Sequence, residues 1–374
     1  MCYADTPALN IGSLRIPFPV VQGGMGVRVS GANLASAVAN AGCAGVIASA
    51  GLGLFEDLKG SESKRLGEEI LRSEIQKARR QSDGVIGVNI MVALSNYEKL
   101  VRVAVEEKVD MIISGAGLPL ALPGYAESSD TKLVPIVSSV RTFQIICRRW
   151  KHHFNRLPDA VVVEGPQAGG HLGYTPEGLA DDSAPTLEQT VTEVVAAANA
   201  FSPPIPVIAA GGVFDGRDIA HFLRLGAAGV QMATRFVCTD ECDVHHNFKQ
   251  AYLDAGPEDV TIINSPVGLP GRVINNSFVE SIKQGKTKPF VCKSQCLRSC
   301  DPRQAPYCIA EVLAKAALGE MDKSFAFAGS NAYRCNEIIP VKELVAKLAD
   351  ELAEALAEEK TVRAAKACLI AKSV

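Results

Sequence analysis

An apolar run ends in a glycine-rich turn at Val161-Val-Val-Glu-Gly-Pro-Gln-Ala-Gly-Gly-His171-Leu-Gly173. An uninterrupted β-branched run is typical of a strand buried on both faces, as in a parallel sheet. The turn carries one carboxylate, Glu164, and one imidazole, His171, which titrates near neutral pH. Gly169 and Gly170 have no Cβ, so the backbone can pass close to a flat ligand. The stretch predicts the rim of an active site, and a simple strand-to-helix turn with a capping histidine is the alternative.

Similar runs recur along the chain, each followed by a turn and a helical pattern. Strands are expected at residues 20–22, 44–49, 85–91, 110–114, 133–138, 160–164, 205–210 and 229–233. Amphipathic helices are expected at residues 31–41, 67–80, 97–108, 142–154, 187–200 and 216–225. Alternation of buried strands with helices predicts a parallel sheet. Eight such units suit a closed (β/α)8 TIM barrel, and an open doubly wound sheet is the alternative.

The positions of the glycines and polar residues favour the barrel. They gather where the expected strands end, at residues 22–26, 89, 114–115, 138–139, 164–171, 211–212 and 233–234. Barrel enzymes build their active sites at that end from converging loops, whereas an open sheet would hold several of these loops too far apart. We therefore predict an α/β fold, a (β/α)8 barrel with its site at the C-terminal rim.

The regular alternation stops after Arg235. Residues 1–235 are predicted to form the barrel, and residues 236–291 a lid inserted after the eighth strand. Residues 292–374 are predicted to form a cysteine-rich loop and closing helices, at 309–318 and 341–359. The charged end of the chain, residues 343–372, could be an oligomer contact, which would make the protein a homo-oligomer, or a solvated tail.

Composition indicates a globular protein that acts on a small molecule. The 374 residues are 47% hydrophobic, and 38 Lys and Arg against 41 Asp and Glu leave a formal charge of −3. This charge offers no overall attraction to nucleic acid or to an anionic membrane. No apolar run reaches the roughly 18 residues that span a bilayer, and the N-terminus does not resemble a signal peptide. We expect a cytoplasmic protein.

Two neighbouring turns are predicted to bind a phosphate group. Gly211 and Gly212 end one strand, just before a helix that begins at residues 214–216. Free N–H groups at such glycines and at a helix N-terminus bind phosphate without a basic side chain. Ala233 and Thr234 end the next strand and would complete the cradle. Phosphate sites of these barrels follow strands seven and eight, which are these two; a pair of ordinary barrel turns is the alternative.

The segment that follows the first expected strand is suited to contact with a planar ring. Gln22-Gly-Gly-Met-Gly26 contains three glycines, which let the backbone lie against a flat face. Asn89 and Ser138 would present polar groups to the edges of that ring. A planar ring with a terminal phosphate indicates FMN. No G-x-G-x-x-G segment is followed at the right distance by an acidic ribose ligand, so no site for a dinucleotide tail is predicted.

These motifs together resemble the nitronate monooxygenase family, formerly the 2-nitropropane dioxygenases, which includes FMN-dependent enoyl-acyl-carrier-protein reductases. The resemblance spans residues 19 to about 276 and is specific only as an ordered set. It is carried by Val21-Gln-Gly-Gly-Met-Gly26, Gly87-Val-Asn-Ile90, Glu164-Gly-Pro-Gln-Ala-Gly-Gly-His-Leu-Gly173, Ala209-Ala-Gly-Gly-Val213 and Gly229-Val-Gln-Met-Ala-Thr-Arg-Phe236. In the lid it continues through Glu241, Lys249 and Gly271-Arg272.

The resemblance implies FMN across the barrel mouth, with His171 facing the substrate beside the flavin ring. The predicted FMN-binding residues are Gln22, Gly23, Gly24, Met25, Asn89, Ser138, Glu164, Gly169, Gly170, Gly211, Gly212, Gln231, Ala233 and Thr234. Two positions depart from the family pattern. Ala233 stands where glycine is usual, which adds a methyl group at the phosphate turn. Gln167 replaces the usual acidic residue, which puts family-typical tuning of the histidine in doubt.

The eleven cysteines are an odd number without a signal peptide, which predicts reduced thiols rather than a disulfide framework. Cys43 and Cys147 fall in apolar helical patterns and are predicted core residues. Four others have no counterpart in the family pattern and lie within 17 residues: Cys292, Cys296, Cys300 and Cys308. Four thiolates could hold an iron–sulfur cluster or zinc. If the segment were helical, Cys292, Cys296 and Cys300 would lie on one face and form a buried stripe. The nearby prolines favour instead a loop wrapped around a metal.

Three functions follow from this site. The first is oxidation of small alkyl nitronates to a carbonyl compound and nitrite, with His171 as general base or as donor to the anion. In the second, NAD(P)H reduces FMN, which passes hydride to an enoyl thioester or a quinone. Gln167 and an iron–sulfur cluster at the four cysteines favour the second function, the reductase. The family name favours the first, the monooxygenase. The third is a non-catalytic FMN-binding subunit that docks a partner.

Overall fold

The structure, a computed structural model, describes residues 3, 6–54 and 60–371, and side chains as far as residue 358. Its centre is an eight-stranded parallel sheet in the order β3-β11-β10-β8-β7-β6-β5-β4. The strands are β3 (Val20–Gln22), β4 (Gly45–Ala48), β5 (Ile86–Met91), β6 (Met111–Gly115), β7 (Lys132–Val137), β8 (Val161–Glu164), β10 (Val207–Ala210) and β11 (Gly229–Met232). A parallel bridge between Val21 and Ala44 joins β3 to the chain entering β4 and closes the sheet. The predicted TIM barrel is confirmed, and the open-sheet alternative is wrong.

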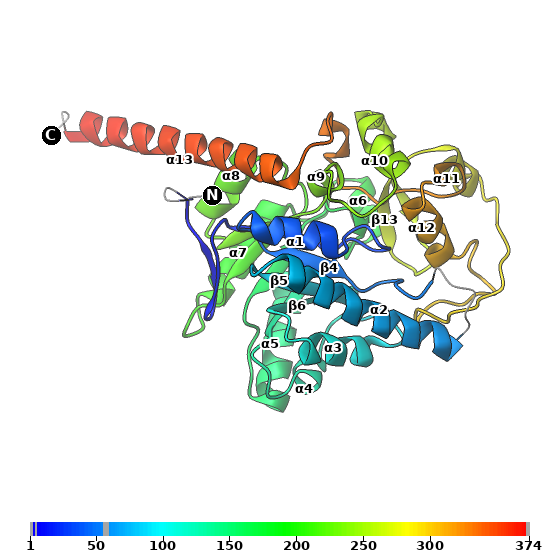
Figure 1. The fold of residues 1–374 in the computed structure, drawn as a ribbon. Coiled ribbons are helices and arrows are strands. Elements are labelled where there is room, and N and C mark those ends of the chain that lie inside the picture. The colour runs from blue at the N-terminus through cyan, green and yellow to red at the C-terminus, as the bar shows by residue number, and fades with distance from the viewer. Residues whose placement is uncertain (1–2, 4–5, 55–59, 372–374) are drawn as a thin grey trace.

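Helices cover the outside of the barrel (Figure 1). They are α1 (Ala32–Asn40), α2 (Gly60–Gln81), α3 (Tyr97–Glu106), α4 (Leu122–Tyr125), α5 (Val140–Phe154), α6 (Pro176–Ala180), α7 (Leu187–Ala198) and α8 (Gly216–Arg224). Their inward faces are apolar: α5, for example, buries Phe143, Ile146 and Trp150. Capping boxes at Thr186 and Asp215 start α7 and α8 and explain why these two predicted helices begin where they do.

An N-terminal hairpin closes the bottom of the barrel. β1 (Leu9–Ile11) and β2 (Leu14–Ile16) pair antiparallel, and Leu9, Ile11 and Ile16 pack with the side chains that fill the barrel interior. Leu9 lies against Gly229, the first residue of β11, so the hairpin is at the N-terminal ends of the strands. The mouth at the opposite end is left for a ligand. Sequence analysis did not predict this hairpin.

The later part of the chain covers the mouth. β12 (Val260–Asn264) and β13 (Pro270–Ile274) form a three-stranded antiparallel sheet with β9 (Gly170–His171), so the loop after β8 pairs with the lid. The other elements are α9 (Thr234–Val237), α10 (His246–Leu253), α11 (Ser277–Lys283), α12 (Ile309–Ala317) and the 3-10 turns Pro257–Asp259, Met321–Lys323 and Ala332–Arg334. An aromatic core of Phe278, Tyr307 and Phe325 holds these segments together. In Figure 1 the hairpin and the lid lie at opposite ends of the barrel.

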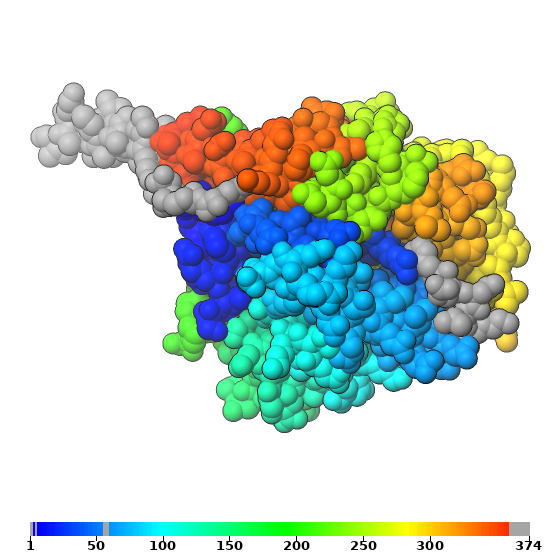
Figure 2. Space-filling model, viewed as in Figure 1, coloured from blue at the N-terminus to red at the C-terminus, as the bar shows by residue number. Residues whose placement is uncertain are grey.

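The last helix, α13 (Val341–Ala371), packs along α8 and α1. Val341, Leu344, Val345, Leu348 and Leu352 are buried there. Figure 2 shows this helix lying over α1, beside the barrel rather than over its mouth. No helix of the described chain has both the length and the apolar composition to cross a membrane.

Candidate functional site

One cavity opens where the barrel strands end and the lid begins. Its wall contains most of the residues predicted to bind FMN or substrate: Gly23, Gly24, Met25, Asn89, Glu164, Gly169, Gly170, His171, Gly211, Gly212, Gln231, Ala233 and Thr234. The lid and the C-terminal segments add apolar side chains: Phe248, Leu297, Ile309, Leu313 and Phe327. Loops from β3, β5, β8, β10 and β11 therefore meet at one site.

Gln22 and Ser138 do not line this cavity, although both were predicted to touch the flavin. Gln22 is fully buried; its Nε2 donates to the Gly23 carbonyl, and its Oε1 accepts from the Val46 N–H at 2.9 Å. It fixes the end of β3 to β4. The Ser138 hydroxyl lies beside Gly173, where an added Cβ would come within 2.6 Å of Ser138 Oγ. Position at a strand end predicted proximity to the mouth but not the direction of the side chain.

On one side of the cavity, the backbone of the first turn presses against Asn89. A Cβ added at Gly24 would lie only 2.3 Å from the Asn89 Cβ, so only glycine fits there. The close approach leaves a smooth wall of backbone, which suits a planar ring.

On the other side, Gly211 and Gly212 form a turn that only glycine adopts easily, with φ of +97° and +85°. An added Cβ at Gly212 would lie 2.2 Å from Oε1 of Gln167. Among the described residues, no protein group accepts from the N–H of either glycine. Nearby in the wall, Oε1 of Gln231 is buried without a hydrogen-bond partner. These unsatisfied groups fit a ligand rich in oxygen and hydroxyl groups, as the ribityl phosphate of FMN is.

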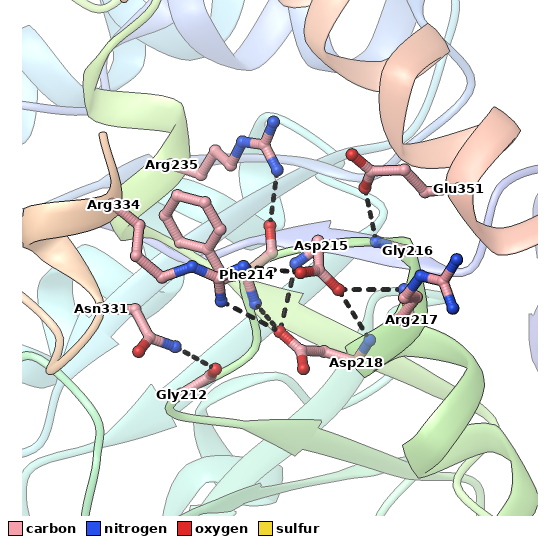
Figure 3. A network of polar contacts seen from close by, with 10 residues as sticks. All are labelled: Gly212, Phe214, Asp215, Gly216, Arg217, Asp218, Arg235, Asn331, Arg334 and Glu351. Atoms are coloured by element: carbon pink, nitrogen blue, oxygen red, sulfur yellow. Dashed lines mark hydrogen bonds and ion pairs between the residues drawn. The ribbon is translucent and has the colours of Figure 1, made fainter. Parts of the chain in front are cut away.

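The N-terminus of α8 is not free for phosphate, contrary to the sequence prediction. Asp215 Oδ1 accepts from the N–H groups of Arg217 and Asp218 at 3.0 Å. Oε2 of Glu351, from α13, accepts from the Gly216 N–H at 2.8 Å (Figure 3). Carboxylates already satisfy this helix end, so an anion would be repelled there. Of the two groups of N–H donors predicted to bind phosphate, only those of the glycine turn remain available among the described residues.

A segment that sequence analysis missed, residues 327–331, supports this turn from outside. The Gly329 N–H donates to Oγ1 of Thr234 at 2.9 Å, and Nδ2 of Asn331 donates to the Gly212 carbonyl at 2.6 Å. Arg334 then binds Asp215 at 2.7 Å (Figure 3). The loops after β10 and β11 are thus held by a segment about 100 residues farther along the chain.

His171 lies in β9 at the junction of barrel and lid. Its Nε2 is 2.7 Å from Oγ of Ser265, and its ring packs edge-on against Phe327. Burial lowers the pKa of His171 to about 4, so the imidazole is neutral near pH 7. Nδ1 has no partner among the described protein groups. Ser265, in the turn between β12 and β13, is a site residue that sequence analysis did not identify.

Arg272 fixes the loop that carries His171. From β13, its Nη1 donates to the carbonyls of Pro166 and Ala168 at 2.6 and 2.7 Å. The guanidinium is therefore used to hold the backbone after β8. None of the described residues in the cavity wall is a lysine or an arginine. The cavity has neutral walls except for one carboxyl group.

That carboxyl belongs to Glu164, at the end of β8. Burial raises its pKa to about 7. The group is thus about half protonated at neutral pH, which is the property of an acid or base matched to that pH. It shares the cavity wall with His171.

We expect Glu164→Gln to stabilise the FMN-free protein strongly at pH 8 and only slightly at pH 4. The pKa of this carboxyl is higher in the folded chain than in the unfolded chain. Its favourable contribution is therefore complete below the unfolded pKa of about 4.3 and is lost as pH rises through about 7. The gain at pH 8 is at most about 4 kcal/mol, measured by urea unfolding.

The control is Glu177→Gln, because Glu177 is exposed in α6. Its effect on unfolding should be small at both pH values. Equal stability of Glu164→Gln and the parent protein at pH 8 would mean that the carboxyl is well solvated.

The cysteines divide into two groups. Cys43 and Cys147 are buried in the core, as predicted, and the nine described cysteines are free thiols. Residues 292–308 form an extended loop, so the helical-stripe interpretation is wrong. Its four cysteines, Cys292, Cys296, Cys300 and Cys308, are only partly buried, and Cys296 lines the cavity.

Comparison with known proteins relates the chain to one family. The family model described as nitronate monooxygenase matches residues 8–351. The "(3aS,4S,5R,7aS)-5-hydroxy-7a-methyl-1-oxo-octahydro-1H-indene-4-carboxyl-CoA dehydrogenase" of Mycobacterium tuberculosis is 33% identical over 72% of this chain. The match spans 66% of that relative, slightly less than two thirds of its length. A "probable nitronate monooxygenase" of Staphylococcus haemolyticus is 28% identical, over 77% of this chain and 84% of its own.

Among solved structures, FabK from Thermotoga maritima is similar over 92% of this chain and 95% of its own. The TM-score is 0.73, and the sequences are 30% identical. The likeness thus extends beyond the barrel into the lid and the C-terminal segments.

Proposed function

This chain belongs to the nitronate monooxygenase family, an FMN-dependent family of oxidoreductases, and from that premise we propose that it binds FMN and oxidises or reduces an acyl thioester. The observation that carries the choice of substrate is the lack of a lysine or arginine among the described residues that line the cavity with His171.

The residues present fit FMN. The ring would lie against the backbone at Gly24, and the phosphate would accept from the free N–H groups of Gly211 and Gly212. Gln231 Oε1, buried without a partner, would accept from a hydroxyl group of the ribityl chain. When bound there, FMN would supply the hydride acceptor or donor. The protein's own residues then have to position the substrate and move one proton.

The charges of the cavity favour a neutral substrate over an anion. A nitronate is an anion and would need a counter-charge, whereas His171 is neutral and Arg272 is bound to loop carbonyls. A thioester carbonyl needs only a hydrogen-bond donor for the charge that develops on its oxygen. Nδ1 of His171 can supply that donor, with Ser265 fixing the tautomer through Nε2. The Glu164 carboxyl can hold or release the proton that is exchanged at the α-carbon.

Part of the cavity wall is apolar. Leu297, Ile309, Leu313 and Phe327 line it, and all four come from the lid or the C-terminal segments. Such a space suits an acyl chain or a fused ring better than a small nitroalkane. Two similar proteins support this choice, since one is named a carboxyl-CoA dehydrogenase and FabK belongs with the enoyl reductases.

Nitronate oxidation is the second candidate. The family name and the staphylococcal relative support it. A neutral His171 is also free to accept a proton as a general base. The two functions differ in which compound exchanges electrons with the bound flavin.

The test uses the FMN-loaded protein without oxygen. We expect NADH or NADPH to bleach the flavin absorption and an enoyl-CoA to restore it, or a saturated acyl-CoA to bleach it directly. An alkyl nitronate should leave the flavin oxidised. Bleaching by the nitronate, with none by the pyridine nucleotides or the acyl-CoA, would establish the second candidate instead.

A further inference from the structure

We propose that the loop of residues 292–308 binds an iron–sulfur cluster through Cys292, Cys296, Cys300 and Cys308, at the edge of the flavin cavity. This site goes beyond the proposed function and does not depend on it. These four thiols are not part of the aromatic core that holds the lid together, which is formed by other residues.

The loop is held in a defined place on the barrel rim. The Ser95 N–H donates to the Cys296 carbonyl at 2.9 Å, and the Ser95 hydroxyl donates to the Gln295 carbonyl at 2.7 Å. The Arg298 N–H donates to the Ala93 carbonyl at 2.9 Å. These bonds join the loop to the turn between β5 and α3. Cys296 consequently reaches the wall of the cavity that holds Asn89 and His171.

The four thiols gather on one side of the loop. Cys292, Cys296 and Cys300 are each partly buried, whereas Lys293, Gln295 and Ser299 beside them are exposed. Cys296 interacts electrostatically with Cys308, Cys292 and Cys300, and Cys300 does so with Cys292 and Cys308, so the four thiols lie near one another.

The spread of the thiols favours a cluster over a single ion. Zinc needs four sulfurs at about 2.3 Å from one centre. No three His, Cys, Asp or Glu side chains in the described chain are grouped tightly enough to hold one ion. A [4Fe–4S] cluster gives each thiolate its own iron, so its four sulfurs lie farther apart.

The charge around the loop also suits a cluster, which is anionic with four thiolates. Residues 283–303 contain six basic residues, Lys283, Lys286, Lys288, Lys293, Arg298 and Arg303, and one acidic residue, Asp301. This excess of positive charge is local, since the whole chain has a formal charge of −3. Nearby positive charge stabilises the cluster and tunes its potential.

The first measurement is the metal and sulfide content of the full-length protein, purified without oxygen. About four iron atoms and about four acid-labile sulfides per chain would support the proposal. One zinc per chain without sulfide would overturn it. So would protein without metal in which all four thiols react with a thiol reagent under native conditions.

Variants then locate the cluster. Cys300→Ser and Cys296→Ser should each lower iron and sulfide by at least half, and the electron paramagnetic resonance signal of the dithionite-reduced protein should fall with them. Cys147→Ala is the matched control, since Cys147 is buried in α5, and it should keep the full iron content. Equal iron in all three variants would overturn the assignment of ligands. Flavin content is measured in parallel, so that failure of FMN binding is distinguished from absence of the cluster.

Discussion

Replacing Gly212 by alanine is expected to weaken FMN binding about 100-fold. Gly212 has φ of +85°, and forcing another residue into that region costs about 1–3 kcal/mol. The new Cβ would also lie 2.2 Å from Oε1 of Gln167, so the turn must shift. A shift turns away the N–H groups proposed to bind the phosphate. A loss of about 2.7 kcal/mol corresponds to the expected change in Kd, measured by fluorescence titration of the FMN-free protein.

Gly268→Ala provides the control for backbone strain. Gly268 has a similar φ of +82°, and a Cβ there meets nothing within 4 Å. This variant should lose stability to a similar degree but bind FMN with the parent affinity. If Gly212→Ala binds FMN as tightly as Gly268→Ala does, the phosphate does not lie on the glycine turn.

The barrel was predictable because its signals are local. Each strand is a short apolar run, each helix has its own period, and glycines mark the ends of β3, β8 and β10. The hairpin was missed because β1 and β2 are short and each has a polar residue between two apolar ones, so neither contains an apolar run. The hairpin closes the N-terminal end of the barrel through packing against the barrel interior, which no local pattern predicts.

The missed parts of the site come from contacts between distant segments. Ser265 lies 94 residues from His171, and Asn331 lies 119 residues from Gly212. No local pattern around Ser265 or Asn331 predicts such a partner. The wrong prediction that the N-terminus of α8 is free for phosphate could have been avoided from the sequence. Asp215 and Asp218 have the spacing of a capping box, and their carboxylates occupy the helix end themselves.

His171→Ala should lower kcat for the true substrate about 100- to 10,000-fold while FMN stays bound. The range is the usual effect of losing a positioned acid, base or oxyanion donor. His171 is neutral and fixed by Ser265, so its contribution comes from one oriented N–H or lone pair. FMN retention is expected because the proposed cofactor contacts lie at Gly24, Gly211 and Gly212. The measurement is single-turnover oxidation or reduction of the flavin by the substrate.

Ser265→Ala separates orientation from chemistry. It removes the partner of Nε2 but leaves the imidazole, so we expect a decrease in kcat of about tenfold, as for the loss of one hydrogen bond. Because burial keeps the pKa of His171 at about 4, the rate of the parent protein should not change through ionisation of His171 between pH 6 and 8. An unchanged rate in His171→Ala for every thioester and nitronate tested, with flavin bound, would contradict both enzymatic proposals. It would favour a non-catalytic flavin-binding subunit, since a donor that the reaction needs cannot be removed without slowing it.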